Sequence, residues 1–121
     1  MVVGPSGSGK SDLALRLIDR GAMLLSDDYT QVQALNGRLV ASAPATIAGK
    51  MEVRDIGIIT LPHVGDMPVA LLVDLDAVRE RMPMPDAQRR VAGIDLPLLT
   101  LRSQEASAPI KVELALKALA S

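Results

Sequence analysis

An amphipathic segment near the start of the chain shows the clearest helical pattern. The apolar side chains of Leu13, Leu17 and Ile18 fall on one face of a helix drawn through residues 11–21. Gly21 closes the segment, and glycine at this place commonly ends a helix. The pattern therefore predicts one amphipathic helix here.

A second helix is predicted over residues 107–120, at the end of the chain. Ser107 stands at the expected N-cap, and Pro109 falls in the first turn, where its missing N–H costs little. The apolar side chains of this helix are Ile110, Val112, Leu114, Leu116 and Leu119. They form a surface broad enough to serve both core packing and contact with another copy of the chain, so a homo-oligomer is expected.

Short apolar runs between these helices predict strands. The runs cover residues 1–3, 22–26, 56–61, 69–75 and 96–102. Asn36-Gly37 divides two further strand-like segments and is a strong hairpin signal. The remaining predictions are a loop at 45–55, a Pro-broken connection at 81–86 and a short helix or turn at 87–93. Strands alternating with helices indicate the α/β class.

Composition narrows the class of protein. The 121 residues suffice for one domain, and 49% of them are apolar, but no run approaches the ~18 residues of a membrane span. Cysteine is absent, which excludes disulfides and thiolate metal sites. A net charge of -1 and a single aromatic residue argue against nucleic-acid binding. These features favour a cytoplasmic protein that binds neither membrane nor nucleic acid.

The segment "GPSGSGKS" matches the phosphate-loop pattern G-x-x-x-x-G-K-[ST] in full. Its residues are Gly4, Pro5, Ser6, Gly7, Ser8, Gly9, Lys10 and Ser11. The glycines allow backbone N–H groups to turn toward phosphate oxygens, and the helix that follows adds its positive end. Lys10 would reach the β- and γ-phosphates, and the Ser11 hydroxyl would ligate Mg²⁺. The motif lies between a strand and an amphipathic helix, as its function requires.

Two pairs of charged residues are candidates for the chemistry beyond the loop. Asp27 and Asp28 follow an apolar run, where one carboxylate could hold Mg²⁺ and the other could accept a hydroxyl proton. Glu52 and Arg54 would share one face of an extended segment. Glu52 could complete a metal site, and Arg54 could offset the charge on a transferring phosphoryl group. An acidic turn and an ordinary surface pair are the plainer alternatives.

At these residues the sequence resembles the C-terminal catalytic domain of the HPr kinase/phosphorylase family. The resemblance runs through "GPSGSGKSDLALRLIDRGAMLLSDD", "MEVRDIGII" and "LPLLTL". It is most similar to the short proteobacterial form that lacks a separate N-terminal domain. The family implies a P-loop fold related to phosphoenolpyruvate carboxykinase, with a mixed sheet and flanking helices. It also implies phosphorylation of a serine on the phosphocarrier HPr with ATP and Mg²⁺, often by a hexamer.

The resemblance also implies roles for single residues. Asp28 would accept the proton of the substrate serine, and Asp27 would support it. Ser11 and Glu52 would be the Mg²⁺ ligands. An ungapped alignment back from "LPLLTL" places Arg81 at the catalytic arginine of the family.

The sequence departs from the family pattern at several places. Asp12 stands where the family usually has Glu, and Asp55 stands where its signature usually has Gly. Many members of the family also run the reverse reaction, in which inorganic phosphate removes the phosphate from HPr and pyrophosphate is released. The Arg-rich loop that the family links to this phosphorolysis is replaced here by "RSQEAS" at residues 102–107, with Arg102 as its only cation. The forward kinase reaction is therefore favoured over phosphorolysis. The only histidine, His63, is interpreted as a loop residue.

Only three residues precede the phosphate loop. The family has a longer leading segment with an active-site histidine, so the chain is expected to be a single kinase domain without its first strand. Such a loss would leave a sheet edge unpaired.

Two other functions stay open from the residues alone. A small-metabolite kinase would need a lid, which "RERMPMPDAQRR" could supply. A non-catalytic nucleotide-binding regulator would explain a missing leading segment. The intact Lys10, Ser11, Asp28 and Glu52 argue against the regulator.

Overall fold

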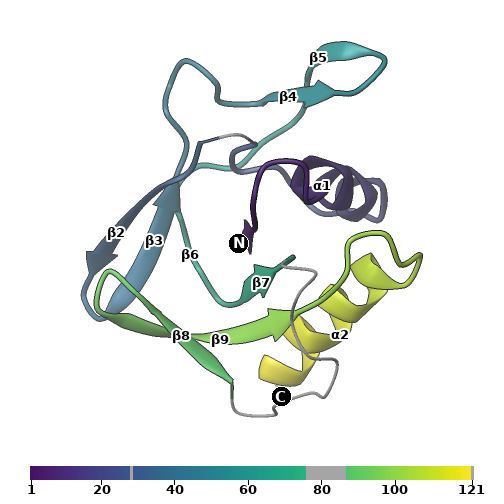
Figure 1. The fold of residues 1–121 in the computed structure, drawn as a ribbon. Helices are drawn as coiled ribbons and strands as arrows, with labels where there is room; N and C mark the ends of the chain where they lie inside the picture. The colour runs from purple at the N-terminus through teal and green to yellow at the C-terminus, as the bar shows by residue number, and fades with distance from the viewer. Residues whose placement is uncertain (28, 76–86, 121) are drawn as a thin grey trace.

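A sheet with three parallel strands forms the centre of the fold (Figure 1). The computed structural model describes residues 1–27, 29–75 and 87–120. The sheet has the strand order β1-β7-β9-β8, with bounds β1 (Val2–Val3), β7 (Leu72–Asp74), β9 (Ile94–Thr100) and β8 (Gln88–Val91). β1, β7 and β9 run parallel, and β8 is antiparallel to β9. The mixed sheet with helices on one side confirms the predicted α/β class.

Two helices, α1 (Lys10–Asp19) and α2 (Ala108–Leu119), cover one face of this sheet. The buried cluster beneath them consists of Leu13, Leu71, Val73, Leu75, Ala108 and Val112. An ion pair of 2.7 Å between Arg20 and Glu113 joins the two helices at the surface. The hydrogen bond from Arg20 to Glu113 raises the pKa of Arg20.

A second, smaller sheet covers the other face. It has the order β2-β3-β6, with bounds β2 (Gln31–Leu35), β3 (Arg38–Ser42) and β6 (Met67–Pro68). Leu39 of β3 packs with Leu72 and Leu96 of the central sheet. Side chains of successive strand residues point to opposite faces, so β7 contributes to both clusters and is buried throughout.

A separate hairpin lies beside α1 (Figure 1). It consists of β4 (Lys50–Val53) and β5 (Gly57–Thr60), paired antiparallel. Asp55 sits in the turn at φ 75°, a left-handed conformation that favours glycine. Asp55 therefore occupies a backbone conformation that a residue with a side chain adopts less readily than glycine.

The two helices and the hairpin turn that were predicted from short-range sequence signals are confirmed. Both helices form, and Gly21 follows the first at φ 108°. Asn36 and Gly37 adopt φ 52° and 76°, so they form the predicted two-residue turn between β2 and β3. Pro109 lies in the first turn of α2, whereas the side chain of Ser107 makes no capping hydrogen bond although Ser107 occupies the N-cap.

Three local predictions are wrong. Residues 22–26 form no strand, and only an isolated bridge joins Leu24 to His63. The predicted loop at 45–55 contains β4, because Lys50–Val53 pairs with β5. The predicted helix or turn at 87–93 is strand β8 followed by a turn at Ala92-Gly93, where φ is 50° and 82°. In the second and third cases pairing with a partner strand decides the local conformation, and in the first such pairing is limited to one bridge.

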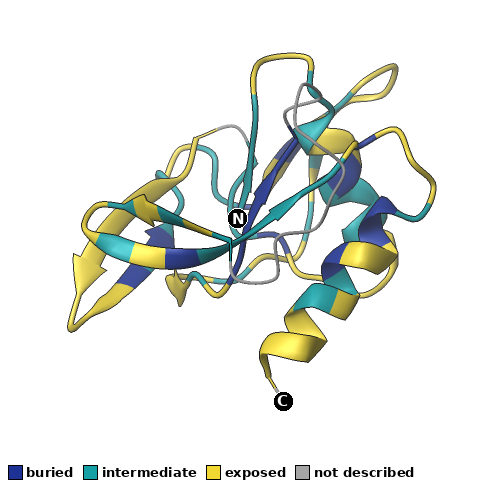
Figure 2. Ribbon diagram, turned by 60° about the horizontal axis from the view of Figure 1, so that its bottom comes forward, coloured by how far each residue is buried: buried dark blue, intermediate teal, exposed yellow. Residues whose placement is uncertain are grey.

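Much of the outer side of α2 is exposed, as Figure 2 shows toward the C-terminus. Among its apolar side chains, Leu114 is 59% exposed and Leu119 is 48% exposed. Within the described residues, no helix is long and apolar enough to cross a membrane.

The core under α1 can be tested by a substitution. Leu13 is fully buried at 0% exposure, so we expect Leu13→Ala to lower the free energy of unfolding by about 2–5 kcal/mol through lost burial and a cavity. Urea denaturation followed by circular dichroism measures the change. Leu35→Ala in β2, where the side chain is 46% exposed, is the control and should change the stability by less than about 0.5 kcal/mol. Equal effects of the two substitutions would contradict this core.

Candidate functional site

The phosphate loop leaves the carboxyl end of β1 and enters α1 directly. Gly9 is the N-cap residue at φ 92°, and its carbonyl accepts the backbone N–H of Leu13 at 3.0 Å. Gly7 also has a left-handed φ, 80°. Only glycine adopts such angles without strain, so the glycine spacing sets the loop conformation. The positive end of the α1 dipole therefore faces the loop.

Lys10 holds the loop from inside. Its Nζ donates to the carbonyl oxygens of Gly4 at 2.7 Å and Pro5 at 3.1 Å. The hydroxyl of Ser8 is buried and has no hydrogen-bond partner among the described residues. A cation and an unsatisfied polar atom in a glycine-rich loop fit a phosphate ligand.

A cluster of oxygen atoms forms at the start of α1. The Ser11 hydroxyl donates to Asp27 Oδ1 at 2.8 Å, and the backbone N–H of Glu52 donates to Asp27 Oδ2 at 3.2 Å. Asp27 therefore joins α1 to β4, although the three residues are far apart in the sequence. The structure brings these three predicted residues together, with Glu52 contributing its backbone.

The donor set at this cluster fits Mg²⁺. Ser11 and Asp27 offer hard oxygen ligands, and Mg²⁺ commonly binds through one or two carboxylates, phosphates and water. Within the described residues, no group of three or more His, Cys, Asp or Glu gathers to hold a metal without such help. Asp28 and Arg81, two predicted catalytic residues, lie outside the described residues.

The remaining candidates lie away from the loop interior. Arg54 is exposed in the turn that follows β4. His63 is exposed in a connecting segment, where its ring would meet a Cβ added to Gly49 at 2.5 Å. The interpretation of His63 as a loop residue agrees with this placement.

A support for the loop comes from the segment after β9 and was not predicted. The hydroxyl of Ser103, a buried residue, donates to the carbonyl of Ser8 at 2.6 Å. Arg16 of α1 donates to the carbonyls of Ser103 and, at 3.1 Å, Glu105. A Cβ added to Gly9 would lie 2.4 Å from Ser103 Oγ. The segment at 102–107 is therefore packed against the phosphate loop, and no local sequence signal marks that contact.

Comparisons with known proteins place this site in a family. The chain matches the family model of the HPr Serine kinase C-terminal domain over residues 1–115. It is 32% identical over 117 residues to HPr kinase/phosphorylase of Geobacillus thermodenitrificans, covering 84% of this chain and 37% of the relative. It is 44% identical over 64 residues to the protein of that name from Clostridium tetani, covering 53% of this chain and 21% of the relative.

A solved structure supports the same assignment. The Hpr(Ser) kinase/phosphatase from Coxiella burnetii superposes with a TM-score of 0.80 at 25% identity, over 97% of this chain and 84% of that chain. The chain spans well under half the length of the two curated relatives named above. With a family model matched over nearly all of its residues and a fold shared with a solved member, the chain belongs to the HPr kinase/phosphorylase family through its C-terminal kinase domain.

Proposed function

We propose that this protein transfers the γ-phosphoryl group of ATP to a serine of HPr, in a reaction that requires Mg²⁺. The observation that carries the proposal is the Ser11–Asp27 hydrogen bond of 2.8 Å at the open end of a complete phosphate loop. It joins the loop hydroxyl that would ligate the metal to a carboxylate from outside the loop.

The loop would bind the nucleotide by exchanging its internal contacts. Lys10 now donates to two loop carbonyls, and the β- and γ-phosphates offer stronger, charged acceptors for the same ammonium group. The backbone N–H groups of the loop and of the N-terminus of α1 add further hydrogen-bond donors for the phosphates, and these donors are already in place. The triphosphate would thereby be held with its γ-phosphorus open to the acceptor.

Ser11 and Asp27 would hold the metal on the side of α1 that faces β4, together with Glu52, the second ligand that the resemblance implies. When bound, Mg²⁺ would neutralise the charge that develops on the β- and γ-phosphates. The oxygen of the HPr serine would bond to the γ-phosphorus as the bond to the bridging oxygen of ADP breaks. Asp28 would accept the serine proton, as the resemblance implies. Arg81 would stabilise the transferring group.

The reverse phosphorolysis is left out of the proposal. In this chain the segment at 102–107 contains one arginine, Arg102, which is exposed. The same segment is engaged with the phosphate loop through Ser103. We therefore propose a kinase that works in the forward direction.

We also propose that the protein acts as a homo-oligomer. Exposed apolar side chains on α2 support contact with another copy. They are Ile110, Leu114, Leu116 and Leu119.

The kinase reaction can be tested with purified HPr from the same genome. We expect HPr incubated with the protein and Mg-ATP to gain the mass of one phosphate on serine, measured by intact mass spectrometry. Asp28→Asn should abolish the gain, because the serine would lose its proton acceptor. Asp66→Asn, the same change of side chain at an exposed residue just before β6, is the matched control and should leave the gain unchanged. Nucleotide binding without transfer to HPr would overturn the proposed acceptor.

The direction of the reaction gives a second test. We expect serine-phosphorylated HPr, incubated with the protein, Mg²⁺ and inorganic phosphate, to keep its phosphate and to release no pyrophosphate. Measurable pyrophosphate, detected by a coupled enzymatic assay, would show that the reverse reaction survives without the Arg-rich loop.

The packing of Ser103 on the loop gives a third test. We expect Gly9→Ala to weaken ATP binding by about tenfold or more, since the new Cβ would overlap Ser103 Oγ and force either segment to move. Gly21→Ala is the control for strain alone, because Gly21 also has a positive φ but a Cβ there meets nothing within 4 Å. Isothermal titration calorimetry measures both affinities. Equal affinities would mean that the contact does not shape the loop.

A further inference from the structure

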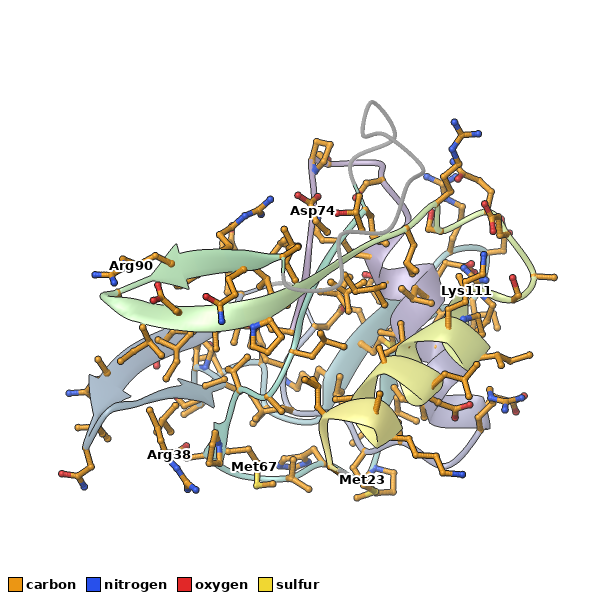
Figure 3. The ribbon with its side chains drawn as sticks, turned by 90° about the horizontal axis from the view of Figure 1, so that it is seen from below. Met23, Arg38, Met67, Asp74, Arg90 and Lys111 are labelled. Atoms are coloured by element: carbon orange, nitrogen blue, oxygen red, sulfur yellow. The ribbon has the colours of Figure 1, made fainter. Side chains whose placement is uncertain are left out.

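The carboxyl ends of the parallel strands place an unassigned ion pair beside the phosphate loop. Val3, the residue before the loop, pairs with Asp74 at the end of β7. A Cβ added to Gly4 would lie 3.3 Å from the Cβ of Leu75. Figure 3 shows Asp74 next to the segment that leads from β1 toward α1. Ligands of parallel sheets bind outside this edge.

Asp74 is buried, and its charge is balanced by a residue from another strand. It is 4% exposed, and Arg89 Nη2 of β8 lies 2.5 Å from its Oδ2. A buried carboxylate requires such a partner because desolvation of an unpaired charge is costly. The pair therefore fixes the position of the Arg89 guanidinium at the edge of the sheet.

Arg89 approaches this edge from the face opposite the helices. It pairs with Leu96, which belongs to the cluster on that face, and Asp74 lies two positions after Leu72 of the same cluster. Lys10 begins α1 on the other face. The two cations thus flank the carboxyl edge of β1 and β7 from opposite sides.

The guanidinium keeps hydrogen-bonding capacity for a ligand. Arginine carries five N–H donors, and among the described residues Arg89 donates only to Asp74, through Nη2. Its side chain is 33% exposed. Its neighbour Arg90 instead donates to both carboxylate oxygens of Asp95, at 3.0 and 3.3 Å, and lies toward the outer end of the hairpin (Figure 3).

We propose that Arg89 binds the terminal phosphates of the nucleotide held by the loop, and that Asp74 positions it for this contact. Arginine suits the role because its planar, permanently charged group contacts two phosphate oxygens at once. This inference rests on the proposed nucleotide binding and adds a residue to that same site. A purely structural ion pair is the opposing explanation.

The test replaces the pair without leaving a buried charge alone. In the double variant Asp74→Asn/Arg89→Gln, both side chains stay polar and can hydrogen-bond each other. The matched control is Asp95→Asn/Arg90→Gln, which removes the neighbouring exposed pair on the same hairpin. Affinities for ATP, ADP and AMP are measured by competition against a fluorescent ATP analogue, and thermal unfolding verifies that each variant is folded.

We expect the double variant to bind ATP about tenfold more weakly, ADP less affected and AMP unchanged, because the contact is to the terminal phosphates. The control should bind all three within about twofold of the unsubstituted protein, since an exposed pair contributes little. An equal loss for all three nucleotides, or no loss, would overturn the inference and leave a structural pair.

A second variant keeps the test decisive if the double variant does not fold. Arg89→Lys preserves the charge beside Asp74 but removes the two-pronged contact, so we expect weaker ATP binding with unchanged AMP binding. Unchanged ATP binding here would count against the inference. Transfer of phosphate to HPr is measured separately. Full transfer together with ATP binding that does not depend on Arg89 would reject this inference alone. ATP binding that depends on Arg89, without transfer to HPr, would reject the proposed acceptor alone.

Discussion

The parallel pairing of β1 with β7 is the contact on which the site depends. β1 consists of two residues, and the loop begins directly after them. Its place is set by backbone hydrogen bonds from Val73 to Met1 at 2.8 Å and from Leu75 to Val3 at 2.9 Å. Because β7 is buried on both faces, it offers a rigid base for a loop whose donors must be in position before phosphate arrives.

Residues from distant parts of the chain complete the site around this base. Ser103 donates a hydrogen bond to the loop carbonyl of Ser8, and Asp27 links the first turn of α1 to β4. Each of these contacts joins a segment adjacent to the loop with one that is remote in sequence. The candidate site therefore depends on contacts across the whole fold, and the glycine-rich loop is its one part that is local in sequence.

What could be predicted from the sequence followed from local signals. Glycine spacing identified the loop, and Asn36-Gly37 identified a hairpin, because both depend on backbone conformations that few residues adopt. Strands β4 and β8 could not be predicted, since each has only four residues, at least half of them polar, and is ordered by its partner strand. The Ser103–Ser8 hydrogen bond spans 95 positions, and the sequence contains no pattern for it.

The contact between Ser103 and the loop would also link the proposed nucleotide binding to the stability of the C-terminal helix. Ser103 lies shortly before α2 begins at Ala108, and Arg16 ties the intervening segment to α1. A ligand that binds only the ordered loop stabilises every segment whose undocking would disorder that loop. Amide hydrogens at the start of α2 would then exchange more slowly with solvent when phosphate is bound, although that helix contributes no ligand to it. Opening of the start of α2 would then be coupled to release of the proposed nucleotide, because both would break the same contacts at Ser103.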